Sequence, residues 1–562
     1  MSQTALRIVI VGGVAGGASA ATRARRMNER AEIIMLEKDD HVSFANCGLP
    51  YYIGGEIQNR AKLLVATPEL FAKRFRIEVR TRHEVRAIDR AAKTVTVHDR
   101  NQDSEYPLSY DKLILAPGAA PLVPPLPGAD APNVYTLRNL VDADRINEAA
   151  KAMTSRQAVV VGAGFIGLEM VEQLVGLGFQ VSLAELQPQV LPLMDAEMVQ
   201  PLADELRERG VRLVLGDGIQ RMVLDDSGRA AGIELASGQR IEGGMVILGL
   251  GVRPQTRLAQ EAGLEIGAGG GIATNRYMQT TDPDIYAVGD AAEYRFGVTG
   301  TPLRVALAGP ANRAGRLAGE HAATGTGHPI ADVFGTAIVR VFRQTAACTG
   351  LTVKLANRLK LPARSVVIVA GSHAGYYPGA ALITLKLTYD PHSGRVLGAQ
   401  AVGRDGIDKR IDVIATALAM KATVWDLAGL DLAYAPPFGS AKDPIHQAAF
   451  AACNELAGLE AFAEPNSDLS ACQVIDVRTA AEVAQRPLAQ VPNVIAIPVD
   501  ELRDRLHELD ANADTVVACG VGMRGHVASR ILRQHGFTRV RNLTGGAELR
   551  ARAVQAASTP AR

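Results

Sequence analysis

The sequence lacks a paired-cysteine motif and an excess of charge of either sign. It has five cysteines, which lie far apart: Cys47, Cys348, Cys453, Cys472 and Cys519. With no Cys-x-x-Cys pair and no cluster of metal-ligand spacing, they favour a reducing compartment, so we expect a cytoplasmic protein without a metal. Lys and Arg total 60 against 59 Asp and Glu, which excludes a global attraction to nucleic acid. The expected ligands are small molecules.

Long hydrophobic runs are also missing. No apolar stretch reaches the ~18 residues that suggest a membrane span, so we expect no membrane partner. The apolar run near the N-terminus is cut by glycines and lacks the charged flank and cleavage site of a signal peptide. At 562 residues, 47% hydrophobic and 21% charged, the chain is predicted to be globular with about three or four domains.

A nucleotide-binding pattern opens the chain. Residues 8–11 are predicted to form a strand, residues 18–27 a helix and residues 33–37 a second strand. The first glycine turn, residues 12–17, departs from G-x-G-x-x-G because Val14 occupies the second glycine position. Glu37 ends the second strand, where a carboxylate accepts both ribose hydroxyls. The residues predicted to approach the dinucleotide are Gly12, Val14, Ala15, Gly16, Gly17 and Glu37.

The pattern is repeated in residues 158–185. The second glycine turn, residues 162–167, matches G-x-G-x-x-G in full, and Glu185 ends the following strand at the expected offset. The sequence motif is therefore a more specific indicator of a dinucleotide site here than in the first glycine turn. Its predicted residues are Gly162, Gly164, Phe165, Ile166, Gly167, Glu169, Glu185 and Gly251.

Cys47 lies just beyond the first of these patterns. Residues 43–55 contain Gly48, Pro50 and two further glycines, which indicates an irregular loop. Ligands of open α/β sheets gather at the carboxyl ends of the strands, so we interpret Cys47 as a reactive thiol beside a dinucleotide. A buried structural cysteine is the alternative interpretation.

A second thiol opens a strand-to-helix turn near the C-terminus. Residues 515–518 are predicted to form a strand, Cys519 follows directly, and a helix is predicted to begin near His526. Backbone N–H groups in such a turn, the helix N-terminus and Arg524 would together stabilise a thiolate or persulfide anion. Cys519 and Arg524 are therefore predicted to be catalytic.

The first 450 residues resemble the flavoprotein disulfide reductases that bind two dinucleotides, and most resemble their single-cysteine branch. The matching motifs are both glycine turns with their glutamates, residues 116–118 and residues 286–290. The resemblance implies a homodimer with FAD on the first site and NAD(P)H on the second. Because no cysteine near Cys47 can pair with it, its oxidised form is expected to be a sulfenic acid or a mixed disulfide. To the FAD site the resemblance adds Lys38, Val85, Ala116, Gly118, Asp290 and Ala308.

The same resemblance implies coenzyme A beside Cys47. The implied residues are Ser19, Arg23, Arg26, Ser43, Phe44, Asn46, Asn312 and Arg313. Arg23 and Arg26 lie three residues apart on one helix face and would bind phosphates, although two solvated arginines are the alternative. Ala15 stands where peroxidase-like relatives hold a histidine, which argues against peroxide chemistry. Tyr376 and Tyr434 are implied to reach the partner's Cys47 and act on a departing sulfur, with simple aromatic packing as the alternative.

The C-terminal segment resembles a rhodanese domain through Asp476-Val477-Arg478, the Cys519 turn and Thr544-Gly545-Gly546. The predicted fold class is α/β, with two Rossmann-like domains, an α+β dimerisation domain and an α/β rhodanese domain. The predicted parts are residues 1–112 and 252–330 (FAD), 113–251 (NAD(P)H), 331–450 (dimerisation), 451–469 (a linker) and 470–562 (rhodanese).

The two resemblances together imply an NADH-dependent reductase of coenzyme A disulfide, persulfide or polysulfide, in which Cys519 carries sulfane sulfur. A short flexible linker would raise the local concentration of one sulfur carrier near the other to about millimolar. A sulfurtransferase with a redox-sensing flavoprotein half and an NADH oxidase are the alternatives.

Glu185 predicts a preference for NADH over NADPH. A 2′-phosphate would meet this carboxylate as a like charge, at a cost of roughly several kcal/mol. Residues 186–189 supply no arginine to bind that phosphate. In steady-state assays with both nucleotides, NADH is expected to give the higher kcat/KM, and a higher value for NADPH would contradict the assignment.

Overall fold

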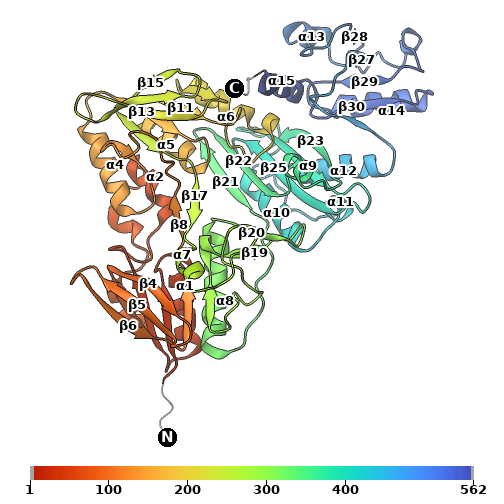
Figure 1. The fold of residues 1–562 in the computed structure, drawn as a ribbon. Coiled ribbons are helices and arrows are strands. Elements are labelled where there is room, and N and C mark those ends of the chain that lie inside the picture. The colour runs from red at the N-terminus through yellow and green to blue at the C-terminus, as the bar shows by residue number, and fades with distance from the viewer. Residues whose placement is uncertain (1–4, 559–562) are drawn as a thin grey trace.

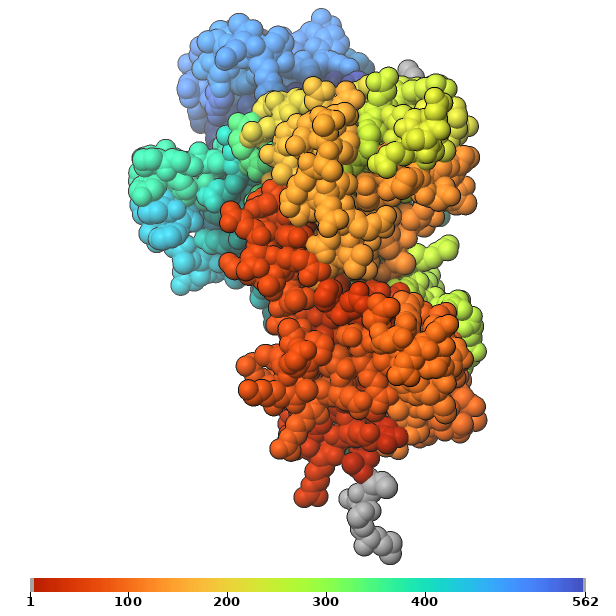
Figure 2. Space-filling view, turned by 90° about the vertical axis from the view of Figure 1, so that its left-hand side faces the viewer, coloured from red at the N-terminus to blue at the C-terminus, as the bar shows by residue number. Residues whose placement is uncertain are grey.

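The structure is a computed structural model that describes residues 5–558. Four domains are each built around a five-stranded sheet, and the first of them combines red and orange elements with a green segment that returns after the second domain (Figure 1). The first domain lies at one end of the molecule and the fourth at the other in both views (Figures 1 and 2). Within the described residues, no helix combines the length and apolar character needed to cross a membrane.

The first domain has a parallel sheet with the strand order β18-β7-β1-β2-β3. The strands are β1 (Arg7–Val11), β2 (Glu32–Glu37), β3 (Glu78–Thr81), β7 (Lys112–Leu115) and β18 (Ile285–Ala287). The central strands are short runs of Ile, Val and Leu because helices cover both faces of a parallel sheet. The β7 strand pairs with β1 and β18, so the predicted domain boundary at residue 112 is wrong by one strand.

Two helices of this domain pack in close contact. They are α1 (Ala15–Met27), which begins three residues before the predicted start, and α8 (Ala308–Thr324). A Cβ at Gly315 would lie 2.1 Å from the carbonyl oxygen of Gly16, and one at Gly319 would lie 2.2 Å from that of Ala20. Glycine at both positions therefore lets the two backbones meet.

Smaller elements complete the first domain. They are the short helices α3 (Pro68–Phe75) and α7 (Arg257–Glu261), the antiparallel sheet of β4 (His83–Asp89), β5 (Thr94–Asp99) and β6 (Ser104–Ser109), and the pair β19 (Glu293–Arg295) and β20 (Pro302–Arg304). The short helix α2 (Leu49–Ile53) belongs to this part of the sequence but packs against the second domain. Strands β8 (Ala119–Pro121) and β17 (Val252–Pro254) pair antiparallel where the chain leaves for the second domain and returns from it.

The second domain repeats the parallel arrangement, with the strand order β12-β11-β10-β16-β9. Its strands are β9 (Val134–Tyr135), β10 (Gln157–Val161), β11 (Gln180–Glu185), β12 (Arg212–Leu215) and β16 (Met245–Leu248). Its helices are α4 (Leu140–Ala152), α5 (Phe165–Gly176) and α6 (Ala196–Glu208). A small antiparallel sheet packs on it, formed by β13 (Ile219–Leu224), β14 (Ala230–Leu235) and β15 (Arg240–Glu242).

The third domain has an antiparallel sheet in the order β21-β22-β25-β24-β23, so β23 lies at an edge. The strands are β21 (Ala337–Val341), β22 (Gln344–Gly350), β23 (Arg364–Gly371), β24 (Leu382–Tyr389) and β25 (Val396–Gly403). The helices are α9 (Val353–Arg358), α10 (Ile407–Ala419), α11 (Val424–Ala428) and α12 (Pro444–Leu456). Because α12 packs on this sheet, the predicted end of the domain at residue 450 cuts through a helix and is wrong.

The fourth domain has a parallel sheet in the order β26-β30-β29-β27-β28. Its strands are β26 (Phe462–Ala463), β27 (Gln473–Asp476), β28 (Ile495–Ala496), β29 (Thr515–Ala518) and β30 (Val540–Leu543). Its helices are α13 (Ala480–Gln485), α14 (Met523–Gln534) and α15 (Gly546–Ala557). The β26 strand pairs with β30 and lies inside the predicted linker, so this domain begins before residue 470.

The fourth domain is docked on the rest of the chain by side-chain contacts. The Thr544 hydroxyl accepts a hydrogen bond from the Val367 N–H of β23 at 2.8 Å and donates one to the Val367 carbonyl at 3.3 Å. Arg552 of α15 donates to Thr384 at 2.9 Å, and α15 packs against α6. The connection between α12 and β26, residues 457–461, is shorter than the predicted linker of residues 451–469, and these contacts dock the domain beyond it.

Replacement of Thr544 by valine tests this docking. Valine would leave the buried N–H and carbonyl of Val367 without their partner, at a cost of about 1–3 kcal/mol for each unsatisfied group. We expect T544V to unfold at a lower temperature than the wild type and to be cleaved faster by protease in residues 457–461. T544S keeps the hydroxyl and serves as the control. If T544V and T544S unfold at the same temperature, Thr544 does not hold the domain.

Candidate active site

One large cavity, of about 1310 Å³, lies between the two glycine turns and contains Cys47 in its wall. No other cysteine of residues 5–558 lines it. From the predicted FAD site it is lined by Gly12, Val14, Ala15, Gly16, Glu37, Lys38, Val85, Ala116, Gly118, Asp290 and Ala308. From the predicted NAD site it is lined by Gly162, Gly164, Phe165, Ile166, Glu169, Glu185 and Gly251.

Gly17 and Gly167 do not line the cavity but hold its wall in place. A Cβ at Gly17 would lie 1.8 Å from the carbonyl oxygen of Gly12, and one at Gly167 would lie 1.9 Å from that of Gly162. Each helix can therefore begin directly against its own turn. The N–H groups of the helix then point into the space where a pyrophosphate would lie.

The two glutamates that end β2 and β11 have the same hydrogen bonds. Glu37 accepts from the N–H of Gly13 at 2.8 Å and from that of Asp39 at 3.0 Å. Glu185 accepts from the N–H of Ala163 at 2.7 Å and from that of Gln187 at 2.8 Å. A carboxylate has about four lone-pair positions, so each glutamate retains acceptors for ribose hydroxyls. The residues of both turns fit two dinucleotides.

Cys47 lies in a one-turn 3-10 helix, Asn46–Gly48, that leads directly into α2. This differs from the irregular loop predicted for residues 43–55. The segment is anchored at its start, where the Ser43 N–H donates to the carbonyl of Gly13 at 2.8 Å. The Cys47 side chain is exposed to the cavity, and its thiol lies 3.7 Å from the side-chain oxygen of Asn46.

The charges around Cys47 disfavour its thiolate. Partial enclosure by protein raises the pKa of the Cys47 thiol, and the nearby carboxylates of Glu169 and Asp290 raise it further. Burial raises the pKa of Glu169 to about 7. The hydrogen bond that the Tyr51 hydroxyl donates to Glu169 at 3.2 Å acts in the opposite direction and lowers this pKa. Arg138, which lies 3.5 Å from Asp290, lowers the pKa of Cys47. No local sequence signal marks Arg138, and our sequence analysis did not find it.

Of the eight residues predicted to bind coenzyme A, two line the cavity and six do not. Phe44 and Asn46 line the cavity beside Cys47. The other six, which do not line it, are Ser19, Arg23, Arg26, Ser43, Asn312 and Arg313. Ser19 donates to Asn312 at 2.6 Å, Arg23 forms an ion pair with Glu320 at 2.6 Å, and Arg26 is exposed. Arg23 and Arg26 thus differ in their surroundings, although both lie on α1.

The two predicted tyrosines lie together on the surface of the third domain. The hydroxyls of Tyr376 and Tyr434 are hydrogen-bonded at 3.0 Å, and the residues are 77% and 49% exposed. Neither lines the cavity that holds Cys47 of the same chain. The structure therefore brings the pair together but leaves it apart from the thiol within one chain.

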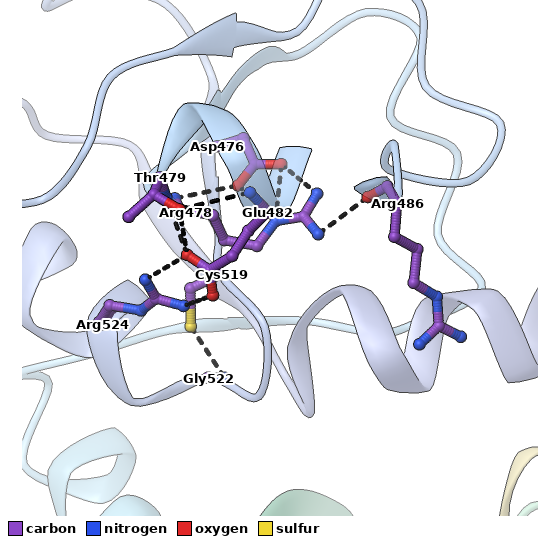
Figure 3. Close-up of polar contacts among 8 residues, drawn as sticks. All are labelled: Asp476, Arg478, Thr479, Glu482, Arg486, Cys519, Gly522 and Arg524. Atoms are coloured by element: carbon purple, nitrogen blue, oxygen red, sulfur yellow. Dashed lines mark hydrogen bonds and ion pairs between the residues drawn. The ribbon is translucent and has the colours of Figure 1, made fainter. Parts of the chain in front are cut away.

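Cys519 follows β29 and is buried, with 1% of its surface exposed. Its sulfur accepts a hydrogen bond from the Gly522 N–H at 3.0 Å (Figure 3). Gly522 has φ +105° and immediately precedes α14, which begins three residues before the predicted start near His526. The loop is also anchored to α15, because the Ala547 N–H donates to the Cys519 carbonyl at 2.8 Å. The predicted backbone donor to the sulfur is thus present.

Arg524 does not donate to the sulfur in this arrangement. Its two terminal nitrogens donate to Glu482 at 2.8 and 2.6 Å, and Arg478 is paired with the buried Asp476 at 2.6 Å (Figure 3). Our sequence analysis missed Glu482. Its local signal is the sequence Thr479-x-x-Glu482, which is typical of a helix capping box and forms one at the start of α13.

Comparison with known proteins agrees with this geometry. Residues 6–315 match the family model "Pyridine nucleotide-disulphide oxidoreductase", residues 336–444 match its dimerisation domain, and residues 460–549 match a rhodanese-like domain. The fold and the cavity define an oxidoreductase that uses FAD and NAD(H). The chain belongs to the pyridine nucleotide-disulphide oxidoreductase family.

Several relatives resemble the chain over most of their length. A coenzyme A disulfide reductase of Staphylococcus aureus strain JH9 is 38% identical over 447 residues, which are 79% of this chain and 99% of the relative. The crystal structure of reduced Bacillus anthracis CoADR-RHD is 44% identical with a TM-score of 0.94, covering 98% of this chain and 99% of that chain. A NAD-dependent persulfide reductase from A. fulgidus is 37% identical with a TM-score of 0.90, covering 97% and 100%.

Removal of the Glu169 charge is expected to make Cys47 more acidic. Because the Glu169 carboxylate raises the pKa of Cys47, E169Q should lower that pKa, so that the thiolate forms at lower pH. The measurement is the pH dependence of iodoacetamide alkylation of Cys47, followed by mass spectrometry of its peptide. E208Q removes a surface carboxylate of the same domain and serves as the control. A pH profile that is identical in E169Q and E208Q would contradict the coupling.

Proposed function

We propose that the chain is an FAD-dependent reductase that uses NADH to reduce coenzyme A disulfide, low-molecular-weight persulfides or polysulfide. The observation that carries the proposal is the position of Cys47, the one described cysteine in the cavity between the two glycine turns. With no second cysteine there to form an internal disulfide, Cys47 would form a mixed disulfide with coenzyme A or a similar thiol.

The chain's residues have distinct tasks on this proposal. FAD, when bound, supplies a two-electron relay between NADH and sulfur. The Cys47 thiolate attacks the inner sulfur of a persulfide RSSH, which forms the mixed disulfide Cys47-S-SR and releases hydrosulfide. Two electrons from NADH then cleave that bond to Cys47 thiolate and free thiol. Arg138 favours the thiolate, while Glu169 and Asp290 oppose it.

We assign FAD to the first domain and NADH to the second, with Glu37 and Glu185 on the ribose hydroxyls. Coenzyme A is assigned to the Cys47 side of α1 and α8, where Arg26 and Arg313 are exposed and Phe44 and Asn46 reach the cavity.

The exposure of the Tyr376 and Tyr434 pair supports a role at the partner's Cys47 in a homodimer. All five cysteines are free, which supports a reducing, cytoplasmic setting.

We infer that Cys519 carries sulfane sulfur to a thiol bound near Cys47. The Gly522 N–H lies where it stabilises an anion on the sulfur. The Cys519 loop of the fourth domain also favours one alternative function, a sulfurtransferase that transfers sulfur to an acceptor without using NADH. The docked position of the fourth domain supports a small thiol as the carrier between the two cysteines.

Hydrosulfide release separates these functions. The full-length protein, loaded with FAD, is mixed anaerobically with NADH and glutathione persulfide, and hydrosulfide and NADH are both followed. We expect C47S to lose NADH-dependent release by at least about a hundredfold, because the thiolate nucleophile is removed. C519S is expected to retain NADH oxidation with coenzyme A disulfide.

Two controls limit the interpretation. C472S removes a partly exposed cysteine of the fourth domain and is expected to behave as the wild type. Rapid NADH-dependent sulfide release by C47S would overturn the reductase proposal. NADH consumption that needs only oxygen and no sulfur substrate would favour an oxidase instead.

A further inference from the structure

Both arginines next to Cys519 are neutralised by carboxylates from one short segment. Arg478 is paired with Asp476, and the two side chains are 4% and 0% exposed. Arg524 donates two hydrogen bonds to Glu482, whose side chain is 42% exposed at the surface of the loop (Figure 3). The last residue of β27 and the first turn of α13 thus bring one negative charge to each guanidinium beside the sulfur.

Glu482 is held firmly in this position. The carboxylate oxygen that accepts from Arg524 at 2.8 Å also accepts from the N–H and the hydroxyl of Thr479, each at 2.9 Å. These hydrogen bonds, with that of Arg524 first, keep the pKa of Glu482 far below its ordinary value. The carboxylate is therefore charged at neutral pH and is paired with Arg524 in this structure.

We propose that Glu482 determines which sulfur donors Cys519 accepts, by selecting against dianions such as thiosulfate and favouring persulfides of low-molecular-weight thiols. The proposal rests on the proposed function only in taking Cys519 as the residue that receives sulfane sulfur. A guanidinium with free N–H groups binds a sulfonate or phosphate through two parallel hydrogen bonds. In this loop Glu482 already occupies those groups on Arg524.

The two sulfur donors differ in the charge of the leaving group that forms beside the Cys519 loop. With thiosulfate, the Cys519 thiolate attacks the outer sulfur, a new S–S bond forms, and the old S–S bond breaks with its electron pair on departing sulfite, a dianion. With a persulfide RSSH, the same attack forms Cys519-S-SH and releases RS⁻, a monoanion. Glu482 opposes the first leaving group more strongly because like charges repel.

Replacement of Glu482 by glutamine tests the role of its charge. Glutamine retains the hydrogen bond to Thr479 that caps α13, so the fold of the segment is kept. The full-length protein is assayed without NADH for thiocyanate formation from cyanide, with thiosulfate or with the persulfide of 2-mercaptoethanol as donor. In E482Q we expect the ratio of kcat/KM for thiosulfate to that for the persulfide to rise at least about tenfold, because a freed guanidinium binds the sulfonate.

Two further variants keep the proposal open to refutation. E508Q removes the same charge from a surface pair with Arg505 and is expected to change the ratio by less than about twofold. Adding R524Q to E482Q is expected to abolish the gain, because the freed guanidinium is then missing. An unchanged ratio in E482Q, or a gain that survives R524Q, would overturn the role of Glu482. By contrast, a wild-type protein that forms no thiocyanate from either donor would contradict the sulfur-carrying role of Cys519 itself.

Discussion

The cavity depends on a close contact between each glycine turn and the chain that follows a neighbouring strand. A Cβ at Gly12 would lie 2.1 Å from the carbonyl oxygen of Ala116, and one at Gly162 would lie 2.5 Å from that of Gly249. Because only glycine permits this approach, both turns stay open toward the ends of the strands. The turn also anchors the reactive segment, since Ser43 donates to Gly13 only four residues before Cys47. The thiol is thus positioned by the same backbone that holds the nucleotide.

The two sulfur centres are chemically unlike, and the fold explains why. Cys47 is exposed to a cavity whose carboxylates disfavour its charge. Cys519 is buried at the end of a strand, with a backbone N–H aimed at its sulfur. One site therefore suits exchange with a small bound thiol, and the other suits retention of an anionic sulfur. Side-chain contacts dock the fourth domain on the third, which is consistent with the proposed small thiol as carrier between the two cysteines.

Features that depend on short, local patterns were predicted from the sequence. Both glycine turns, their glutamates and the Cys519 turn rest on residues at fixed offsets. The structure has a strand, a turn and a helix at each of these places, and a backbone N–H donates to the Cys519 sulfur, although Arg524 donates to Glu482 instead. The domain boundaries at residues 112 and 470 were wrong because β7 and β26 belong to their sheets only through pairing with strands far away in sequence. Arg138 escaped prediction for the same reason. Glu482 carries a local capping-box signal, but its contact with Arg524 depends on residues 42 positions apart in sequence.

Thr544 has a consequence beyond fixing the orientation of the fourth domain. Strand β23 ends the sheet of the third domain, and an uncovered outer strand offers free N–H and carbonyl groups to any other chain. The hydroxyl of Thr544 occupies both groups of Val367 near the middle of that strand. The appended domain thereby occupies two backbone groups of the edge strand that would otherwise be free to pair with a further strand.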